Sequence, residues 1–396
     1  MKETKFKNTE IGKIPEDWEV RTINSFCSVK TGPFGSMLHA EDYVAKGTPI
    51  VTTEHFKNGI LPLVGKDIPQ VGIEDLKRMS SYTLTKDDIV FSRVGSVDIN
   101  ALVTVRQKGW LFSGRVLRVR PFKQTDSLYL HYGLLKHSVR SDIVSRAVGL
   151  TMASINTKIL GETELSLPPL NEQHRIASAL TSIDNLISSL GKLIEKKKNI
   201  KQGAMQQLLT GKTRLKGFNE PWVEKKLGEV CSVKRGVRVV KRNLTTDGLY
   251  PVYQNTNIPL GYSNQYNVEA NTPFVIIGGS AGQVGICRER YWAADDCAFF
   301  ACHDIYKEYL YYVLLLNQRN ILHNVRTGTI PRLDRTFLSG MLVYISSNIA
   351  EQQAIATILT KMDDEITALE AKKAKYEAIK QGMMQQLLTG KIRLIS

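Results

Sequence analysis

The sequence predicts an α+β protein with two globular domains, each followed by a long helix, and the two helices pair through an apolar seam. Three observations predict this: a helical segment that occurs twice, an apolar period of about 3.5 residues inside it, and β-branched runs with glycine-rich turns ahead of each copy. The 396 residues are 42% hydrophobic and 23% charged, which suits two or three domains. This composition, with only five cysteines, excludes disordered, collagen-like and disulfide-scaffold proteins.

An internal repeat sets the domain organisation. Residues 172–215 match residues 351–394 at a constant offset of 179, with 24 identities in 44 positions. The segment MQQLLTGK is identical in both copies. A shorter match aligns residues 18–32 with residues 222–236 and shares Cys-Ser-Val-Lys. The chain is therefore interpreted as domain, helix, domain, helix, with predicted boundaries at 1–170, 171–217, 218–349 and 350–396.

Each globular part carries strand signals first and helix signals later. Residues 86–120 and 271–301 hold β-branched runs broken by Gly and Asp, which predicts a strand, a tight turn and a second strand. Short helices are predicted within residues 128–148 and 305–326. Strands followed by helices within one unit indicate α+β domains.

Both repeated segments place apolar residues in alternating steps of four and three, which is typical of a coiled-coil seam. The predicted helix-pairing residues are Ile176, Leu180, Ile183, Ile187, Leu190 and Ile194 in the first segment, and Ile355, Leu359, Met362, Ile366 and Leu369 in the second. An amphipathic helix packed only on its own domain is the alternative, but it does not explain why the same seam occurs twice. A continuous helix over residues 172–210 would be about 58 Å long at 1.5 Å per residue.

Two pairs of glycines recur at matching positions of the repeat. Gly211 and Gly390 follow Leu-Leu-Thr and are predicted to cap the helix ends. Gly203 and Gly382 lie within the helices, where each glycine costs about 1 kcal/mol relative to alanine. Their recurrence favours the close approach of a second helix, and a local break in the helix is the alternative.

The formal charge of +15 favours an acidic partner, and nucleic acid is the leading candidate because Lys and Arg neutralise phosphates. Residues 171–217 alone have a net charge of +6. A lysine cluster in this segment, which includes Lys196 and Lys197, is predicted to lie along a DNA backbone; a solvated helix face is the alternative.

The sequence favours a cytoplasmic protein without a bound metal. Its N-terminus has no apolar leader, and the apolar stretch around residues 309–316 is too short to span a bilayer. The five cysteines form no CxxC pair, which is typical of reduced thiols. A zinc site made by Cys297, Cys302 and His303 is conceivable, but buried small hydrophobic side chains are favoured.

The chain resembles the specificity subunits of type I restriction-modification systems over essentially its whole length. The resemblance is carried by GKIPEDW at residues 12–18, LPPLNEQ at residues 167–173 and QQLLTGK at residues 206–212. One departure is that Asn348-Ile349-Ala350 replaces the Pro-Pro-Leu-Asn lead-in before the second helix. The resemblance implies two target-recognition domains, each reading one half of a bipartite double-stranded DNA sequence. It also implies an antiparallel pair of helices that docks two methyltransferase subunits, with restriction/translocase subunits joining for cleavage.

Catalytic motifs are missing from the sequence. Its one Pro-Pro pair, Pro168-Pro169, occurs in Leu-Pro-Pro-Leu rather than in the Asn/Asp-Pro-Pro-aromatic loop of an amino-methyltransferase. The sequence also contains neither a glycine-rich loop in a βαβ context for S-adenosylmethionine nor a P-loop for ATP. Glu74, Asp75 and Lys77 faintly resemble a nuclease carboxylate-lysine set, but a solvated helix is favoured. We therefore expect a non-catalytic subunit that itself binds no cofactor, so that S-adenosylmethionine, ATP and Mg²⁺ would belong to partner subunits. A self-contained DNA-modifying or DNA-cleaving enzyme, and a coiled-coil scaffold without DNA contact, are the alternatives.

Direct reading of bases requires polar side chains on loops that reach the groove edges. The predicted DNA-binding residues are Lys30, Thr31, Ser36, Arg93 and Ser96 in the first domain, Arg235, Arg238, Ser280, Gln283, Arg326 and Arg332 in the second, and Lys196 and Lys197 on the helix. For each loop residue the alternative is a solvated side chain. An arginine bidentate to guanine would contribute ~1–3 kcal/mol at one half-site only.

Overall fold

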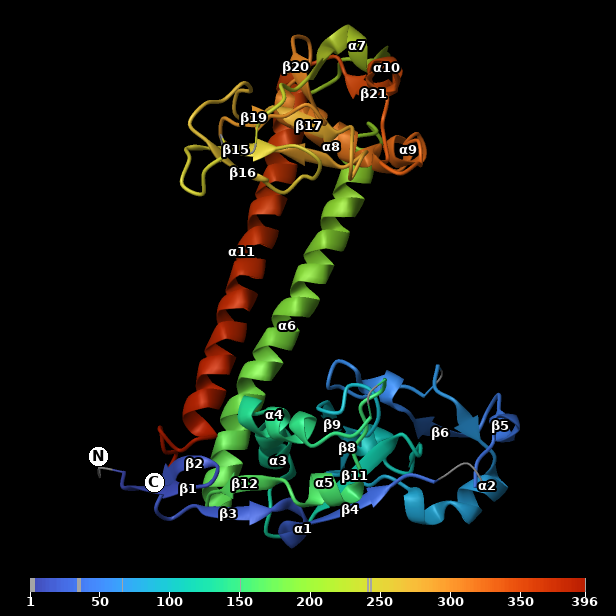
Figure 1. Cartoon of the computed structure of the whole chain (residues 1–396). Helices are drawn as coiled ribbons and strands as arrows, with labels where there is room; N and C mark the ends of the chain where they lie inside the picture. The colour runs from blue at the N-terminus through green and yellow to red at the C-terminus, as the bar shows by residue number, and fades with distance from the viewer. Residues whose placement is uncertain are drawn as a thin grey trace. The chain divides into compact units, whose positions relative to one another are not determined.

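The computed structural model describes residues 4–33, 37–65, 67–149, 151–240, 242 and 244–395. The chain forms two compact units, Met1–Ser189 with Lys373–Ser396, and Leu190–Lys372. The division falls inside two 39-residue helices, α6 (Leu170–Leu208) and α11 (Ile349–Leu387), which are labelled in Figure 1. Each unit therefore contains one globular domain, the beginning of the helix that follows that domain, and the end of the other helix.

The first domain is organised around an antiparallel sheet of order β4-β11-β8-β9. Its strands are β4 (Cys27–Thr31), β8 (Ile89–Ser92), β9 (Asn100–Leu102) and β11 (Val116–Pro121). A second sheet, β10-β6-β7-β5, contains β5 (Tyr43–Val44), β6 (Thr48–Val51), β7 (Gln70–Val71) and β10 (Leu111–Phe112). In addition, β3 (Glu19–Thr22) pairs with β12 (Glu164–Leu167), and β1 (Phe6–Thr9) pairs with β2 (Gly12–Pro15).

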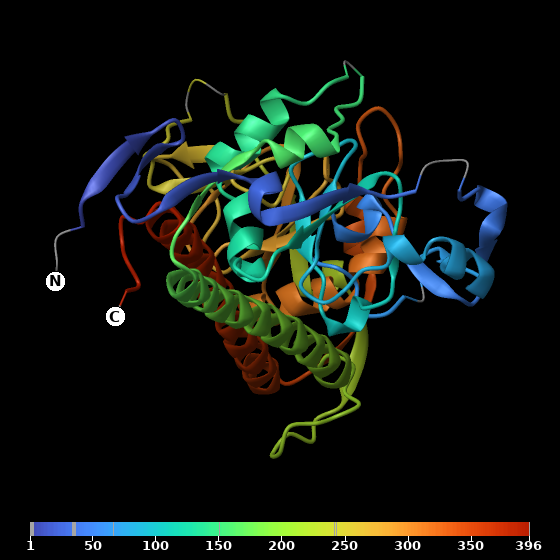
Figure 2. The ribbon, with the colours of Figure 1, turned by 90° about the horizontal axis from the view of Figure 1, so that it is seen from below.

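Short helices connect and cover these strands. They are α1 (Ile23–Phe26), α2 (Ile73–Arg78), α3 (Ser127–Leu134), α4 (His137–Ser145) and α5 (Thr157–Gly161), with 3-10 turns at Ala40–Asp42, Thr53–Phe56, Ser80–Tyr82 and Val105–Gln107. The helical signal over residues 128–148 divides into α3 and α4 because Lys136 takes an extended conformation (ψ 133°). The β1–β2 hairpin and the segment after α11 lie on the same side of this unit (Figure 2), where Arg393 pairs with Asp17.

The second domain repeats the four-stranded main sheet and the flanking strand pair of the first domain with different side chains. Its main sheet has the order β14-β20-β17-β18, from β14 (Cys231–Arg235), β17 (Pro273–Ile276), β18 (Val284–Ile286) and β20 (Cys297–Cys302). A sheet of order β16-β15-β19 contains β15 (Tyr250–Tyr253), β16 (Gly261–Ser263) and β19 (Trp292–Ala293), and β13 (Trp222–Lys226) pairs with β21 (Leu342–Ser346). Its helices are α7 (Leu227–Val230), α8 (Lys307–Leu316), α9 (Gln318–His323) and α10 (Arg335–Gly340). The α+β prediction is confirmed, and the divergent middles of the two halves share one fold.

Both domain cores are completed by the end of the other domain's helix. In the first unit, Leu387 and Leu388 from the end of α11 are buried in a cluster with Trp18 and Leu180. In the second unit, Leu208 and Leu209 from the end of α6 are buried with Trp222, Leu227 and Leu359. Burial of a leucine side chain contributes ~1.5–3 kcal/mol, so each domain is anchored to both helices.

Within each unit the two helices run antiparallel. Lys380 near the end of α11 pairs with Asp184 near the beginning of α6 at 2.6 Å, and Lys201 near the end of α6 pairs with Asp363 near the beginning of α11 at 2.5 Å. Among the predicted helix-pairing residues, Ile176, Leu180, Ile183, Leu190, Ile194, Ile355, Leu359 and Ile366 are buried, while Ile187, Met362 and Leu369 are half-buried. The first apolar positions of each helix, such as Ile176 and Ile355, are part of the domain cores.

The two pairs of repeated glycines differ in conformation and surroundings. Gly211 and Gly390 lie just beyond the helix ends in the left-handed region, at φ 68° and 69°, as predicted for capping residues. The expectation for Gly203 and Gly382 is wrong: both helices continue through them, and a Cβ at either position would meet no atom within 4 Å. These two glycines therefore mark neither a close approach within the chain nor a break.

In the part of the chain that the structure describes, no helix has the length and apolar character needed to cross a membrane. The same residues contain no group of three or more His, Cys, Asp or Glu side chains arranged to hold a metal ion. Cys297 is buried in β20, and its burial raises the pKa of the thiol above its ordinary value. Glu74 pairs with Lys77 at 2.9 Å on the exposed surface of α2.

Candidate nucleic-acid interface

Arg93 joins the loops of the first domain at the end of β8. Its Nη1 donates to the carbonyl of Gly114 at 2.9 Å and to Thr31 Oγ1 at 3.4 Å, and its Nε donates to the carbonyl of Ile155 at 3.3 Å. These bonds connect the end of β4, the turn before β11 and the loop before α5. Direct contact of Arg93 with a guanine would require some of these bonds to break, so in this conformation Arg93 positions loops.

In the second domain, other residues form the hydrogen bonds that hold the equivalent loops. Arg235 Nε donates to the carbonyl of Asp295 at 2.7 Å, and Arg332 Nη1 pairs with Asp296 Oδ1 at 3.0 Å. Ile277 occupies the place of Arg93, because the amides of Leu333 and Ile155 donate to the carbonyls of Ile277 and Arg93 in the two domains. The loop geometry is thus shared while the side chains that hold it differ.

A glycine turn follows the same central strand in each domain and contacts a second loop. Gly95 and Gly279 have φ 84° and 85°, a conformation that favours glycine. Their amides donate to the carbonyls of Ala153 at 2.8 Å and Pro331 at 3.2 Å. The next residue in each turn, Ser96 or Ser280, is a predicted DNA-binding residue.

In the first domain, the structure separates the predicted DNA-binding residues into two groups. Thr31, Arg93 and Ser96 belong to the loops described above, and Ser96 is exposed. Lys30 lies on the sheet, where its Nζ donates to the carbonyl and the hydroxyl of Ser81, each at 3.0 Å. Ser36 lies outside the described residues.

In the second domain, the predicted residues lie on three neighbouring loops. Gln283 follows the glycine turn and accepts a hydrogen bond from the amide of Asn257 at 3.3 Å. Arg326 and Arg332 pair through their backbones, and both are exposed. Arg238 is exposed on the segment after β14. Hydrogen bonds between loops link the segments that carry Arg235, Ser280 and Arg332, and their spacing along the sequence does not indicate this connection.

The lysine cluster of α6 is largely paired with α11. Lys197 pairs with Glu365 at 2.6 Å and Lys198 pairs with Glu370 at 2.7 Å, while Lys196 is exposed. These pairs offset much of the positive charge that suggested a DNA contact. Exposed ion pairs contribute little stability, typically ~0–1 kcal/mol each.

A buried carboxylate at the start of each long helix was not predicted from the sequence. Glu172 is 2% exposed; it accepts from Trp18 Nε1 at 3.0 Å and from Arg393 Nε and Nη2, both at 2.8 Å. Arg393 also binds Asp17, and these hydrogen bonds raise the pKa of the guanidinium above its ordinary value. We call Asp17, Trp18, Glu172 and Arg393 the first end cluster.

The second unit contains the equivalent cluster. Glu351 is fully buried; it accepts from Trp222 Nε1 at 3.1 Å, from Arg214 Nε at 2.7 Å and Nη2 at 2.9 Å, and from the Ser346 hydroxyl at 2.5 Å. Both Glu-Arg pairs are identical positions of the repeat, and that identity was the signal available in the sequence.

A tyrosine reinforces each junction about three helical turns further along the helix. Tyr132 donates to Asp184 at 2.7 Å, and Asp184 also pairs with Lys380. In the second unit Tyr312 donates to Asp363 at 2.8 Å, and Asp363 also pairs with Lys201. Each domain is thereby fixed to the beginning of its own helix and to the end of the other helix.

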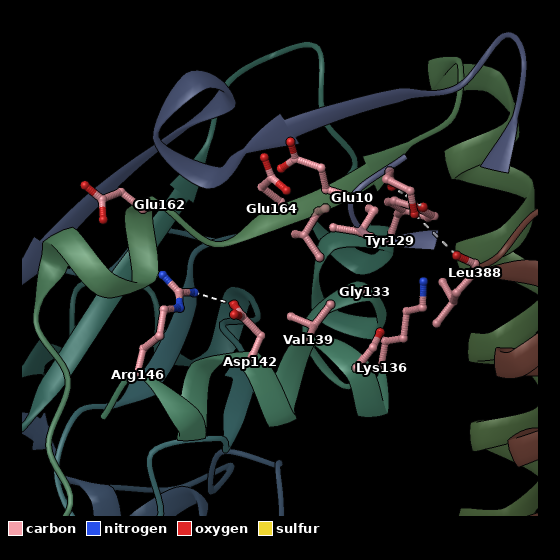
Figure 3. Close-up of a pocket in the computed structure, with 14 residues that line it drawn as sticks. Glu10, Tyr129, Gly133, Lys136, Val139, Asp142, Arg146, Glu162, Glu164 and Leu388 are labelled. Atoms are coloured by element: carbon pink, nitrogen blue, oxygen red, sulfur yellow. Dashed lines mark hydrogen bonds and ion pairs between the residues drawn. The ribbon is translucent and has the colours of Figure 1, made fainter. Parts of the chain in front are cut away.

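A pocket of about 470 Å³ lies between α3, α4, β12 and the end of α11 in the first unit (Figure 3). Tyr129 lines the pocket and donates to the carbonyl of Ser166 at 2.7 Å. Lys136 lines the pocket, and burial lowers the pKa of its ammonium. The acidic lining residues Glu10, Asp142, Glu162 and Glu164 outnumber the basic Lys136 and Arg146. Their negative charge makes the pocket unfavourable for a phosphate.

Comparison with known proteins identifies the family. The family model described as the type I restriction modification DNA specificity domain matches residues 15–202 and 219–381. The type I restriction enzyme MjaVIII specificity subunit of Methanocaldococcus jannaschii is 28% identical over 437 aligned positions, which cover 99% of this chain and 97% of that protein.

Two solved structures share the fold. The type I restriction-modification S subunit from M. genitalium has a TM-score of 0.69 at 19% identity, with 93% of this chain and 96% of that chain covered. A chain from a structural study of assembly of the type I R-M system has a TM-score of 0.54 at 14% identity, with coverage of 96% and 99%. Two matches of one family model, one on each domain with its helix, account for most of the sequence. The chain therefore belongs to the family of type I restriction modification DNA specificity domains.

Proposed function

We propose that this chain is the non-catalytic DNA-recognition subunit of a type I restriction-modification complex. It reads a bipartite double-stranded target, with one half-site per domain, and docks two methyltransferase subunits through its helices. The observation that carries this proposal is the equivalent framework of the two domains, in which the same strands and loops present different side chains. A shared framework with different loop residues is suited to reading two different short sequences.

The loops around the glycine turns are proposed to enter the DNA grooves. Ser96 in the first domain, and Ser280 and Arg332 in the second, lie on loops held by hydrogen bonds to neighbouring loops. Such loops provide donors and acceptors at fixed positions, which direct base reading requires. The DNA-binding residues predicted from the sequence remain candidates for these contacts.

The docking proposal is supported by exposed residues that recur in both helices and whose side chains form no hydrogen bond or ion pair within the described part of the chain. Lys196, Ile200 and Gly203 of α6 are exposed and are identical to Lys375, Ile379 and Gly382 of α11. Their spacing places them on one face of each helix, which we call the repeat face. Ile200 is 47% exposed and Ile379 is 40% exposed, although aqueous solvent favours polar residues at such positions.

A groove borders the repeat face in each unit. In the first unit it has a volume of about 390 Å³ and is lined by Gln381, Met384 and Gln385. In the second unit it has a volume of about 430 Å³ and is lined by Gln202, Met205 and Gln206, the same positions of the repeat. Two equivalent surfaces are suited to two copies of one partner, and a glycine on each surface allows that partner to approach the helix closely.

Replacing a repeat-face glycine by leucine is expected to prevent the binding of one methyltransferase copy at that helix. Gly203→Leu should affect one copy, Gly382→Leu the other, and the double variant both, because the new side chain occupies the space left for the partner. The variants should also be slightly more stable, by up to ~1 kcal/mol each, because leucine is a better helix former. Native mass spectrometry of the reconstituted complex measures the number of bound copies.

Ser189→Leu and Ala368→Leu are matched controls for this experiment. Both residues are exposed, occupy matching helix positions and differ between the two copies of the repeat. The controls should retain both methyltransferase copies. Two bound copies at unchanged affinity in the Gly203→Leu/Gly382→Leu variant would contradict the docking proposal.

The methylome of cells that contain the complete system tests the recognition proposal. We expect one methylated motif composed of two short half-sites separated by unspecified bases. A continuous motif would contradict the one-half-site-per-domain assignment. S-adenosylmethionine, ATP and Mg²⁺ are proposed to bind the partner subunits in the cytoplasm, so methyl transfer or cleavage by the purified chain alone would instead support a self-contained enzyme.

A further inference from the structure

Two cations face each other on the main sheet of the first domain. Lys30 on β4 and Arg118 on β11 are direct cross-strand partners, and Arg120 lies two residues along on the same face. Arg120 is neutralised by Asp88, to which it donates two hydrogen bonds of 2.6 and 2.7 Å. Among the described residues no carboxylate pairs with Lys30 or Arg118, so this group of four has a net charge of +2.

The charge on Arg118 is poorly compensated. Arg118 is 6% exposed, and its Nε has no hydrogen-bond partner within the described part of the chain. Its guanidinium carbon lies 5.9 Å from the ring centre of Phe112, and Lys30 Nζ lies 4.1 Å from that of Tyr82. Like charges directly opposite each other in a sheet are destabilising, and a buried guanidinium normally requires an anion. The pKa of Lys30 is lowered, first by burial and then by Arg118 and Arg120.

The second domain demonstrates that the fold does not require this arginine. Lys234 on β14 corresponds to Lys30, and its cross-strand partner on β20 is Phe299. An aromatic side chain therefore completes the same pair of strands without a second charge. A buried cation without an anionic partner at this position of the first domain points to a ligand.

We propose that Lys30 and Arg118 form a phosphate-binding site that holds a backbone phosphate of DNA beside the first half-site. The phosphate oxygens would supply the missing negative charge and accept hydrogen bonds from the guanidinium and the ammonium. Such a contact positions the duplex without selecting a base. This inference rests on the proposed function, and it assigns Lys30 to the phosphate backbone rather than to a base edge.

Replacing Arg118 by methionine is expected to weaken DNA binding without lowering the stability of the fold. In the complex with the methyltransferase, Arg118→Met should weaken binding to the target duplex about tenfold and reduce the slope of log affinity against log salt by about 1. The midpoint of thermal unfolding should stay unchanged or rise, because an uncompensated buried charge is removed. Lys30→Met should lower the salt slope in the same way and provides a second measurement if Arg118→Met is poorly folded.

Phe299→Met is the matched control, because it changes the equivalent position of the second domain without removing a charge. It should leave the salt slope unchanged. An unchanged slope in both Arg118→Met and Lys30→Met, with normal binding by the wild-type complex, would overturn this inference alone. A wild-type complex without salt-dependent DNA binding would overturn the proposed function and this inference with it.

Inorganic phosphate distinguishes the DNA backbone from a free anion as the source of the ligand. Millimolar phosphate should raise the thermal midpoint of the wild-type protein and not that of Arg118→Met, because ligand binding to the folded state stabilises it. This rise of the wild-type thermal midpoint, together with a reduced salt slope in Arg118→Met, supports a DNA phosphate as the ligand. The phosphate response with an unchanged slope would overturn it in favour of a free anion.

Discussion

Replacing Arg393 by alanine is expected to lower the free energy of unfolding of the first unit by about 3–5 kcal/mol, the usual cost of leaving a buried charge without its partner. Arg393 provides two hydrogen bonds to Glu172, whose carboxylate is 2% exposed. Among the residues that the structure describes, Trp18 Nε1 and the amide of Leu394 would be the donors left to this carboxylate in the variant. Such a loss is a large part of the stability of a typical domain.

Urea unfolding followed by circular dichroism and by tryptophan fluorescence measures this effect. Arg214→Ala is the matched variant, because it removes the equivalent partner of Glu351, and it should destabilise the second unit by a similar amount. The double variant Glu172→Leu/Arg393→Met should be much less destabilised than Arg393→Ala, because it leaves no isolated buried charge and Asp17 is exposed to solvent. A loss below about 1 kcal/mol in Arg393→Ala would mean that the first end cluster does not hold the unit together.

Exchanging residues 17–168 for those of another specificity subunit is expected to replace one half-site completely and preserve the other. The physical reason is that the glycine turn and its neighbouring loops are held by hydrogen bonds within the first domain. The donor segment must retain the counterparts of Trp18 and Tyr132, which bind Glu172 and Asp184 on α6. Methylome sequencing of cells carrying the hybrid identifies both half-sites.

The reciprocal exchange of residues 219–348 is the control for this experiment. It should preserve the half-site that the first exchange replaced. Unchanged specificity in either hybrid, or a change of both half-sites in one hybrid, would contradict the assignment of one half-site to each domain.

Much of the architecture could be predicted from the sequence because the relevant signals are local. Ile176, Leu180 and Ile183 repeat with helical spacing, and a helix is defined by hydrogen bonds between near neighbours. Gly211 and Gly390 could be predicted as caps because helices commonly end with a left-handed glycine. The division of residues 128–148 into α3 and α4 was not specified, because Lys136 breaks the helix without a proline or glycine signal.

The candidate site depended more strongly on long-range contacts. Arg93 was predicted from its place in a turn, but its hydrogen bonds to Gly114 and Ile155 come from segments 21 and 62 residues away. Arg118 was not predicted, because its neighbours in the sequence do not indicate that β4 places Lys30 directly opposite it. Lys197 was predicted to face DNA, and its pairing with Glu365 depends on the antiparallel arrangement of the helices.

By itself, the sequence determined the two-domain organisation, the long helices with their apolar seam, and the likeness to a family of DNA specificity proteins. These follow from repetition and periodicity, which are readable along the chain. Only the tertiary structure decided that the end of each helix completes the core of the other domain, through Leu388 beside Trp18 and Leu209 beside Trp222. It also decided that Glu172 meets Arg393, 221 residues away. Burial and charge pairing depend on which segments meet in space, and no local pattern specifies those partners.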